Sequence, residues 1–169
     1  MRVGLMADSH DRVPAVAELL RQMQEAGVSM VLHAGDFVSP LVLKPFEERH
    51  ITLVGVFGRN DGDHQGLLSR AQAGLGLEIF ESPHSFDVSG HQILVVHDLA
   101  DVQKRSVKNH SIVVHGFAHQ QSLKSTGDTV IVNPGETCGW LHGTPSAAIL
   151  DLDNKKVEFL SLQGEQWKF

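Results

Sequence analysis

The feature that most constrains this chain is an alternation of short apolar runs with amphipathic helical segments in its first half. Three runs have the length and composition of buried strands: Arg2–Ala7, Met30–Ala34 and Ile51–Phe57. Each is followed by a segment with helical spacing or helix-start signals. These segments begin near Pro14 and end at Gly27, extend over Leu41–Glu48 after Ser39-Pro40, and lie near Gln65–Ala73. The alternation predicts an α/β domain.

The second half is richer in strands that are joined by tight turns. Three two-residue turn signals, Ser89-Gly90, Gly127-Asp128 and Asp153-Asn154, predict hairpins. Their strands are Ser85–Val88 with Gln92–Val96, Gln121–Ser125 with Thr129–Val132, and Ala147–Leu152 with Lys156–Leu162. A helix near Ala100–Asn109 and a strand at Ser111–Val114 complete the pattern. We expect two mixed sheets packed together under outer helices, in one domain over residues 1–169.

Composition excludes several classes of protein. The net charge of −6 is opposite to that of a general nucleic-acid binder. No apolar run approaches the roughly 20 residues of a membrane span, and the start does not resemble a signal peptide. The single cysteine, Cys138, excludes an internal disulfide framework and a thiolate zinc site. We therefore expect a cytoplasmic protein that does not bind membranes.

Polar side chains follow six of the apolar strands at the point where each strand ends. They are Asp8, Ser9, His10 and Asp11; Asp36; Arg59, Asn60 and Asp61; His97 and Asp98; His115 and His119; and Asn133. Ligands of open α/β sheets bind at the carboxyl ends of strands. Mixed Asp and His sets are ligands for Mn²⁺, Fe²⁺ or Zn²⁺. The pattern therefore predicts a metal site at one rim of the sheets.

These residues resemble the ordered motifs of the calcineurin-like metallophosphoesterases, which run D-x-H, G-D, G-N-x-D, H and G-H-x-H. The matching positions are Asp8-Ser9-His10, Gly35-Asp36, Gly58 with Asp61, His97, and Gly116 with His119. The likeness is greatest to the small single-domain phosphodiesterases of bacteria and archaea. Their late N-P-G-E-x-C-G segment resembles residues 133–139.

The resemblance implies a four-layer α/β/β/α sandwich with two divalent ions at the strand ends. Such paired ions lie roughly 3.5–4 Å apart and activate a hydroxide for in-line attack on a phosphoryl group. By position, Asp8, His10 and His119 belong to the first metal, Asp36 bridges, and His97 belongs to the second. Mn²⁺ is the expected ion, with Fe, Zn or Ni as alternatives, at one or two ions per chain.

The sequence departs from the family pattern at the second metal. Arg59 stands where the family has an amide ligand, and Phe117 stands where it has an imidazole. Asp98 replaces a residue that is usually small. Only Asp36 and His97 remain as ligands, which is too few to hold a divalent ion well.

Three interpretations follow from this departure. In the first, substitutes rebuild the second site, namely Asn60, Asp98 or His115. In the second, one metal binds and the Arg59 guanidinium replaces the other, since it is a permanent cation suited to phosphate oxygens. In the third, the protein is an inactive scaffold, like the retromer subunit of this family. Several carboxylates would crowd the pocket, and compensation of their charge by Arg59 favours the second interpretation.

The sequence therefore predicts a metal-dependent hydrolase of a small phosphodiester or phosphomonoester, with a binding or scaffold protein as the alternative. Arg59 would bind the phosphate, His97 would act as a ligand or proton donor, and Asn60 would face the substrate. An amide cannot act as a general acid, so the leaving group would take its proton from water or His97. The resemblance also implies a homodimer or tetramer.

Three further residues have open roles at this point. His33 is either buried in the core or hydrogen-bonded to a ligand. Asp61 is interpreted as a partner that orients an imidazole. Cys138 is interpreted as a small buried hydrophobic residue rather than a nucleophile.

Overall fold

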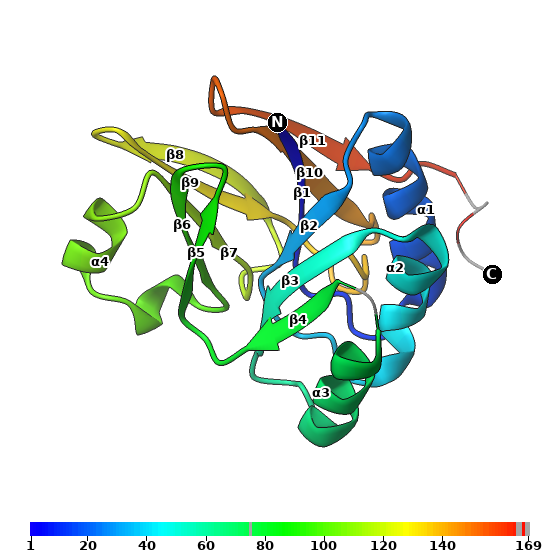
Figure 1. Cartoon of the computed structure of the whole chain (residues 1–169). Coiled ribbons are helices and arrows are strands. Elements are labelled where there is room, and N and C mark those ends of the chain that lie inside the picture. Colours follow the sequence, from blue (N-terminus) through cyan, green and yellow to red (C-terminus); the bar gives the residue numbers. More distant parts are fainter. Residues whose placement is uncertain (75, 165–166, 168–169) are drawn as a thin grey trace.

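Two β-sheets face each other in the computed structural model, which describes residues 1–74, 76–164 and 167 (Figure 1). The first sheet contains β1 (Arg2–Met6), β2 (Met30–His33), β3 (Thr52–Val56), β4 (Leu77–Phe80), β10 (Ser146–Asp151) and β11 (Lys156–Ser161), in the order β11-β10-β1-β2-β3-β4. The second contains β5 (His84–Val88), β6 (His91–Val96), β7 (Ile112–His115), β8 (Gln121–Thr126) and β9 (Thr129–Pro134), in the order β5-β6-β7-β9-β8. The prediction of two mixed sheets is confirmed.

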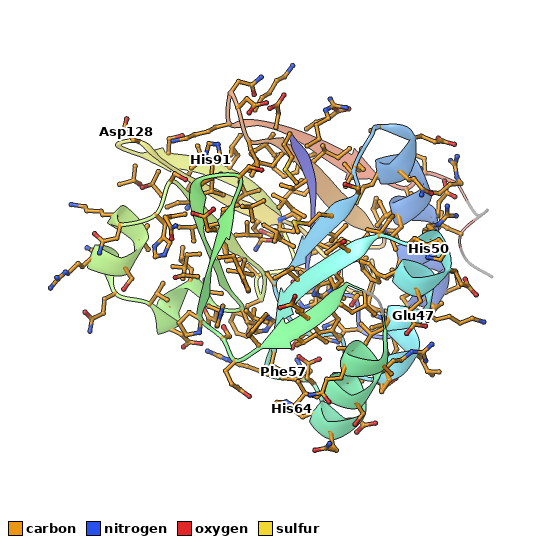
Figure 2. The ribbon with its side chains drawn as sticks, in the orientation of Figure 1. Glu47, His50, Phe57, His64, His91 and Asp128 are labelled. Carbon is orange, nitrogen blue, oxygen red and sulfur yellow. The ribbon has the colours of Figure 1, made fainter. Side chains whose placement is uncertain are left out.

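Helices cover the outer face of the first sheet (Figure 1). They are α1 (Val13–Glu25), α2 (Lys44–Arg49) and α3 (His64–Ala73), with the 3₁₀ helix η1 (Pro40–Leu43) before α2. The predicted apolar face of α1 is buried, with Val16, Leu20 and Met23 inaccessible to solvent. At the start of α3, His64 stacks on Phe57 with ring centroids 4.0 Å apart, and Figure 2 labels both.

The outer layer on the second sheet is thin. It consists of the 3₁₀ helix η2 (Leu99–Asp101) and the short helix α4 (Lys104–Lys108). Their apolar side chains pack against a small cluster on that sheet, made of Leu94, Val96, Val113 and Ile131. The expected order of helix, sheet, sheet and helix is therefore present, although the fourth layer is small.

Two apolar clusters make up most of the core, a larger one between the first sheet and its helices and a second one between the two sheets, and strand alternation explains both. In β1, Val3 and Leu5 point into the cluster between the sheets, while Met6 points into the cluster under the helices. Strands buried on both faces read as continuous apolar runs, which is why this segment showed no alternation in the sequence. Across the sheet interface, Ile93 and Val114 belong to the same cluster as Val3 and Leu5.

The parallel strands place the six polar strand ends at a common rim. β1, β2, β3 and β4 are mutually parallel neighbours, and so are β6, β7 and β9 in the other sheet. Hydrogen bonds join the ends of the strands, since Asp8 N donates to Gly35 O (3.0 Å) and Gly116 N donates to His97 O (3.0 Å). The two sheets thus bring residues separated by more than a hundred positions to one site.

Two details differ from the sequence prediction. β4, which pairs with β3, was not predicted, because its four residues give only a weak alternation signal. The helix expected near Ala100–Asn109 divides into η2 and α4, with Val102 extended between them. Within the described part of the chain, no helix has the length and apolar character that crossing a bilayer requires.

Candidate metal centre

Four side chains converge at the rim to form a group that fits a metal ion. Asp8, His10, Asp36 and His119 each offer a donor atom, and these four atoms lie within 4.8 Å of one another. All four residues have a positive φ, between 39° and 61°. Such backbone is costly for residues other than glycine and is retained where the surroundings enforce it, which is common at functional sites. Here the hydrogen bond from His10 N to Asp36 O (3.0 Å) joins two of the loops.

Several buried oxygen and nitrogen atoms that could bind a metal at this centre have no hydrogen-bond partner. Among the described residues, these are Asp8 Oδ2, His10 Nε2 and His97 Nε2. A buried polar atom without a partner costs about 1–3 kcal/mol, so three in one place call for an explanation. Carboxylate oxygens and imidazole nitrogens that face one another fit a divalent cation, which would satisfy them together.

Hydrogen bonds fix the orientation of two imidazoles. The Nδ1 atom of His119 lies 2.8 Å from Glu136 Oε2, and that of His97 lies 2.8 Å from the Ala34 carbonyl oxygen. Each Nδ1 therefore donates its proton, which leaves the Nε2 lone pair free for a metal. Asp36 lies between the two halves of the centre, with Oδ2 3.3 Å from His10 Nε2 and Oδ1 3.4 Å from His97 Nε2. This is the placement expected of a bridging carboxylate.

Two motif glycines are required by close approach. A Cβ atom on Gly58 would lie 2.2 Å from Asp36 Oδ1, and one on Gly35 would lie 2.8 Å from His97 Nδ1. Gly35 also has a φ of 95°. Any side chain at either position would displace a candidate ligand.

Arg59 occupies the altered half of the centre. Its Nη2 atom lies 2.7 Å from Asp98 Oδ2 and 3.3 Å from Asp101 Oδ1, and its guanidinium lies 4.5 Å from the centroid of the Phe117 ring. The Phe117 ring in turn meets the His97 ring edge-on at 5.7 Å. The side chain of Arg59 remains 51 % exposed, so it is available to a substrate.

The three residues considered as substitute ligands have other contacts. Asn60 holds Asp36, because its backbone N donates to Oδ1 (2.8 Å) and its Nδ2 donates to Oδ2 (2.7 Å). Asp98 pairs with Arg59 and accepts a hydrogen bond from Ala100 N (2.9 Å). His115 is half-buried, with Nδ1 3.4 Å from the Gly116 carbonyl oxygen. In the described part of the chain, neither Asp98 nor His115 joins a cluster of potential ligands. A rebuilt second site stays a prediction that this geometry does not favour.

The interpretation of Asp61 was wrong. Its carboxylate accepts hydrogen bonds from the backbone N atoms of Gly58 (2.6 Å) and Val38 (2.8 Å), not from an imidazole. Asp61 therefore holds together the two loops that carry Asp36 and Arg59. Val38 has a φ of 86°, which is unusual for a β-branched residue.

Sequence reasoning assigned no role to Glu136, although it lies in the motif quoted above. The residue is buried and accepts hydrogen bonds from His119 Nδ1 (2.8 Å), Leu141 N (3.0 Å) and His142 N (2.6 Å). Burial by itself would raise the pKa of Glu136, but these hydrogen bonds hold it below the ordinary value. Glu136 is thus the anion that orients the His119 ring.

Replacing Glu136 with glutamine tests this role. The amide keeps the shape of the side chain but loses the charge, so we expect metal affinity to fall by about 10- to 100-fold, as for other groups that orient a metal-binding imidazole. Isothermal titration calorimetry with Mn²⁺ measures the change. Glu158→Gln is a matched control, because Glu158 is an exposed residue of β11. Equal affinity in both variants would contradict the role.

Burial disfavours the charged form of the Asp8 carboxylate. Complete burial raises the pKa of Asp8 to about 6, although His119 and His97 act in the opposite direction. Burial also raises the pKa of the Cys138 thiol to about 12, which agrees with its interpretation as unreactive toward substrate. For Asp36, hydrogen bonds from Asn60 outweigh burial and lower the pKa.

His33 is a buried residue that contacts the loops of the metal centre. It is buried, its Nδ1 accepts a hydrogen bond from Gly35 N (3.2 Å), and its Nε2 lies 3.0 Å from Ser9 Oγ. The ring also stacks on Phe37 with centroids 3.9 Å apart. Burial lowers the pKa of His33 to about 3, so the neutral ring connects the Ser9 and Gly35 loops. Of the two roles left open for His33, burial in the core is the one that the structure shows.

This burial predicts a pH dependence of stability. The unfolded chain protonates His33 near pH 6.5 and the folded chain only near pH 3, so the free energy of unfolding falls as pH decreases through that window. In His33→Gln this contribution disappears while the amide preserves a donor and an acceptor. We expect the slope of unfolding free energy against pH, between pH 4 and 6, to be shallower by about 1.4 kcal/mol per pH unit. Urea unfolding with chelator present measures it, and identical slopes would contradict it.

Comparison with known proteins agrees with the geometry. Residues 1–155 match the calcineurin-like phosphoesterase superfamily domain. The chain belongs to this superfamily. Membership of this superfamily supports metal-dependent hydrolysis of a phosphoester, as the resemblance implied. Phosphodiesterase MJ0936 of Methanocaldococcus jannaschii is 28 % identical over 166 residues, covering 96 % of this chain and all of the relative.

Solved structures show the same fold. The structure of an archaeal phosphodiesterase superposes with a TM-score of 0.88 at 28 % identity, covering 96 % of this chain and 100 % of the other. A Vps29 structure from Entamoeba histolytica, described as complexed with zinc, superposes at 0.66 with 16 % identity, covering 96 % and 98 %. The latter identity is low enough that it supports the fold alone.

Proposed function

We propose that this protein hydrolyses a small phosphodiester or phosphomonoester with a single divalent ion held by Asp8, His10, Asp36 and His119. The observation that carries the proposal is the set of buried donor atoms without hydrogen-bond partners at the strand ends. When bound, the ion would polarise a phosphoryl oxygen and make a water more acidic. Asp8 and Asp36 supply the negative charge that the ion balances.

Arg59 is proposed to take the place of the second ion in binding substrate. Its fixed positive charge and planar donors match two phosphate oxygens. In the free protein the guanidinium is held by Asp98 and Asp101 and rests on Phe117, beside His97. An entering phosphate would compete with these exposed or partly exposed carboxylates for the same donors.

His97 and Asn60 complete the proposed site. His97 Nε2 is buried and has no hydrogen-bond partner, so it either binds an ion through its lone pair or, in the doubly protonated imidazolium form, gives a proton to the leaving group. Asn60 acts on Asp36, whose two oxygens it holds in place by hydrogen bonds. This contact favours a positioning role for Asn60 over the direct substrate contact expected from the sequence.

The finer properties of the protein are also proposals. Mn²⁺ is the ion that we expect to support hydrolysis, with Fe, Zn or Ni as alternatives, since the carboxylate oxygens and imidazoles accept all of them. We propose a small phosphoester rather than a nucleic acid as substrate, because the net charge is −6. Residues 1–169 are proposed to act as one domain in the cytoplasm, as a homodimer or tetramer.

Hydrolysis of bis-p-nitrophenyl phosphate across a Mn²⁺ titration tests the function, with chelator as control. We expect turnover that saturates with the ion and disappears with chelator. The ion-to-protein ratio measured under the same conditions should be one. A folded protein without turnover at saturating Mn²⁺ would overturn the proposal and favour the alternative of a scaffold protein.

A further inference from the structure

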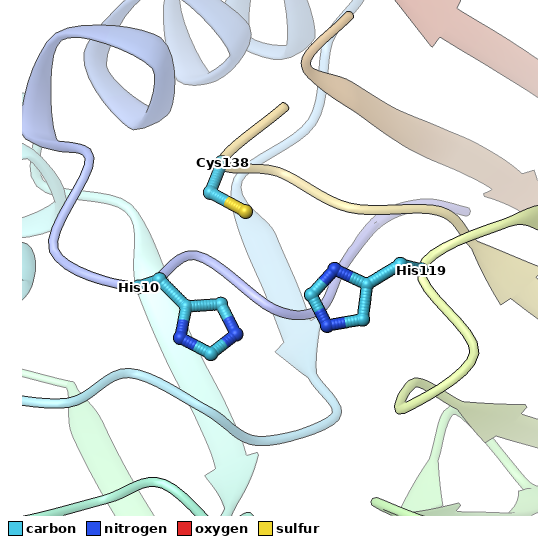
Figure 3. A group of neighbouring side chains, drawn as sticks. All are labelled: His10, His119 and Cys138. Carbon is cyan, nitrogen blue, oxygen red and sulfur yellow. The ribbon is translucent and has the colours of Figure 1, made fainter. Parts of the chain in front are cut away.

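A thiol lies beside the two imidazoles of the metal centre. Cys138 is fully buried, and its sulfur forms a second group of potential ligands with one nitrogen each of His10 and His119, all within 4.8 Å of one another. Figure 3 shows these three side chains directed toward a common region, although they come from different segments of the chain. The protein has one cysteine, and it lies at this position.

The backbone fixes the thiol in this place. Cys138 N donates to Asp8 O (3.0 Å), and Thr137 N donates to Ala7 O (2.9 Å), so the cysteine segment is tied to the loop that carries Asp8. On the other side, Arg12 Nη1 donates to Cys138 O (2.8 Å). The cysteine segment is therefore held next to the centre by two main-chain hydrogen bonds and by one from the Arg12 side chain.

A second observation points to a ligand in the neighbouring group, which shares His10 and His119 with the thiol. Asp8 is completely buried, and its Oδ2 has no hydrogen-bond partner. Asp8 shares its cluster with His10 and His119, the two residues that also group with Cys138. The sulfur accepts a hydrogen bond from the Trp140 backbone N. It also lies 3.6 Å from Glu136 Oε2, which also accepts from His119 and Leu141. Glu136 therefore keeps other partners if the thiol turns toward an ion.

We infer that Cys138 is a sulfur ligand of this centre, which makes it selective for thiophilic divalent ions such as Zn²⁺ and Cd²⁺ over Mn²⁺. One sulfur beside nitrogen and oxygen donors does not require the several cysteines whose absence excluded a thiolate zinc site from the sequence. Thiolate sulfur prefers these ions, whereas carboxylate and imidazole donors accept all three. On binding, the S–H bond breaks, the sulfur–metal bond forms, and the proton passes to solvent; the ion stays divalent. The inference rests on the proposed function for the existence of the centre.

Absorption spectroscopy of the Co²⁺-loaded protein tests the inference. Cobalt reports a thiolate ligand through an intense near-ultraviolet charge-transfer band. Because the protein has a single cysteine, such a band in the unmodified protein arises from Cys138. We expect the band in the wild-type protein and its loss in Cys138→Ser and Cys138→Ala, while both variants still bind Co²⁺.

Ion selectivity is the second measurement. We expect the ratio of Zn²⁺ to Mn²⁺ affinity to fall by about tenfold or more in Cys138→Ala, since loss of a ligand costs at least as much as loss of a group that orients one. Wild-type protein that binds Co²⁺ stoichiometrically without the band would overturn the inference, and so would an unchanged affinity ratio. If the variants fail to fold, the wild-type spectrum decides alone.

These outcomes are separable from the proposed function. A protein that shows the band but does not hydrolyse phosphoesters keeps Cys138 as a ligand and loses the enzymatic proposal. A protein that hydrolyses phosphoesters with Mn²⁺ but shows no band keeps the activity and loses the sulfur ligand.

Discussion

His10→Ala should abolish binding of the divalent ion and lower phosphoester hydrolysis by about a thousandfold, which corresponds to several kcal/mol of transition-state stabilisation from the ion. His10 Nε2 is a buried donor without a hydrogen-bond partner and lies 3.3 Å from Asp36 Oδ2. Its removal leaves Asp8, Asp36 and His119 with too few donors and an uncompensated buried charge. Calorimetry with Mn²⁺ and bis-p-nitrophenyl phosphate turnover measure the two effects.

The control for this variant is another histidine away from the centre. His50 is exposed at the end of α2, as Figure 2 shows, and has a φ of 54°, which asparagine tolerates. His50→Asn should therefore bind Mn²⁺ and turn over substrate as the wild-type protein does. Full ion occupancy in His10→Ala would show that the ligands are assigned incorrectly.

The double variant Arg59→Asn with Phe117→His should raise the number of bound ions from one to two per chain. It supplies the amide and the imidazole that the family has at these positions, next to His97, whose Nε2 has no hydrogen-bond partner. Phe117 has a φ of 65°, a conformation that histidine adopts more readily, so the change adds no backbone strain. A second ion should raise turnover by about tenfold or more, since it adds charge stabilisation at the phosphate.

Single variants separate the two contributions. Arg59→Ala removes the cation without adding a ligand, so we expect KM to rise and the ion count to stay at one. Inductively coupled plasma mass spectrometry of dialysed protein gives the count. Two ions in the wild-type protein would contradict the replacement of an ion by Arg59. That result would favour the hypothesis that substitute ligands rebuild the second metal site.

The alternation of strand and helix could be predicted from the sequence because the patterns that indicate it are local. The apolar run of β1 and the apolar face of α1 each follow from residues close in the sequence, and both are confirmed. The short strand β4 was missed although Leu77, Glu78 and Ile79 alternate as in a half-buried strand, because four residues give a weak local signal. Helix α4 depends on tertiary contacts, because its five residues pack against the second sheet.

The sequence predicted which residues are candidate ligands, and the fold brings them close together. The motifs predicted Asp8, His10, Asp36 and His119, which the parallel strands bring within 4.8 Å of one another. They did not predict which groups support them. Asp61 binds backbone amides instead of an imidazole, and Glu136 is the carboxylate that orients His119.

The sequence by itself determined the α/β class, the positions of most strands and the residue types at the strand ends, because strand alternation, helix spacing and turn signals act over a few residues. The tertiary structure alone decided how these ends face one another. It pairs the Arg59 guanidinium with Asp98 and hydrogen-bonds Glu136 to His119. It also places Cys138 against the Asp8 loop. These contacts join residues up to 130 positions apart (Asp8 and Cys138), and the packing of the two sheets sets their distances.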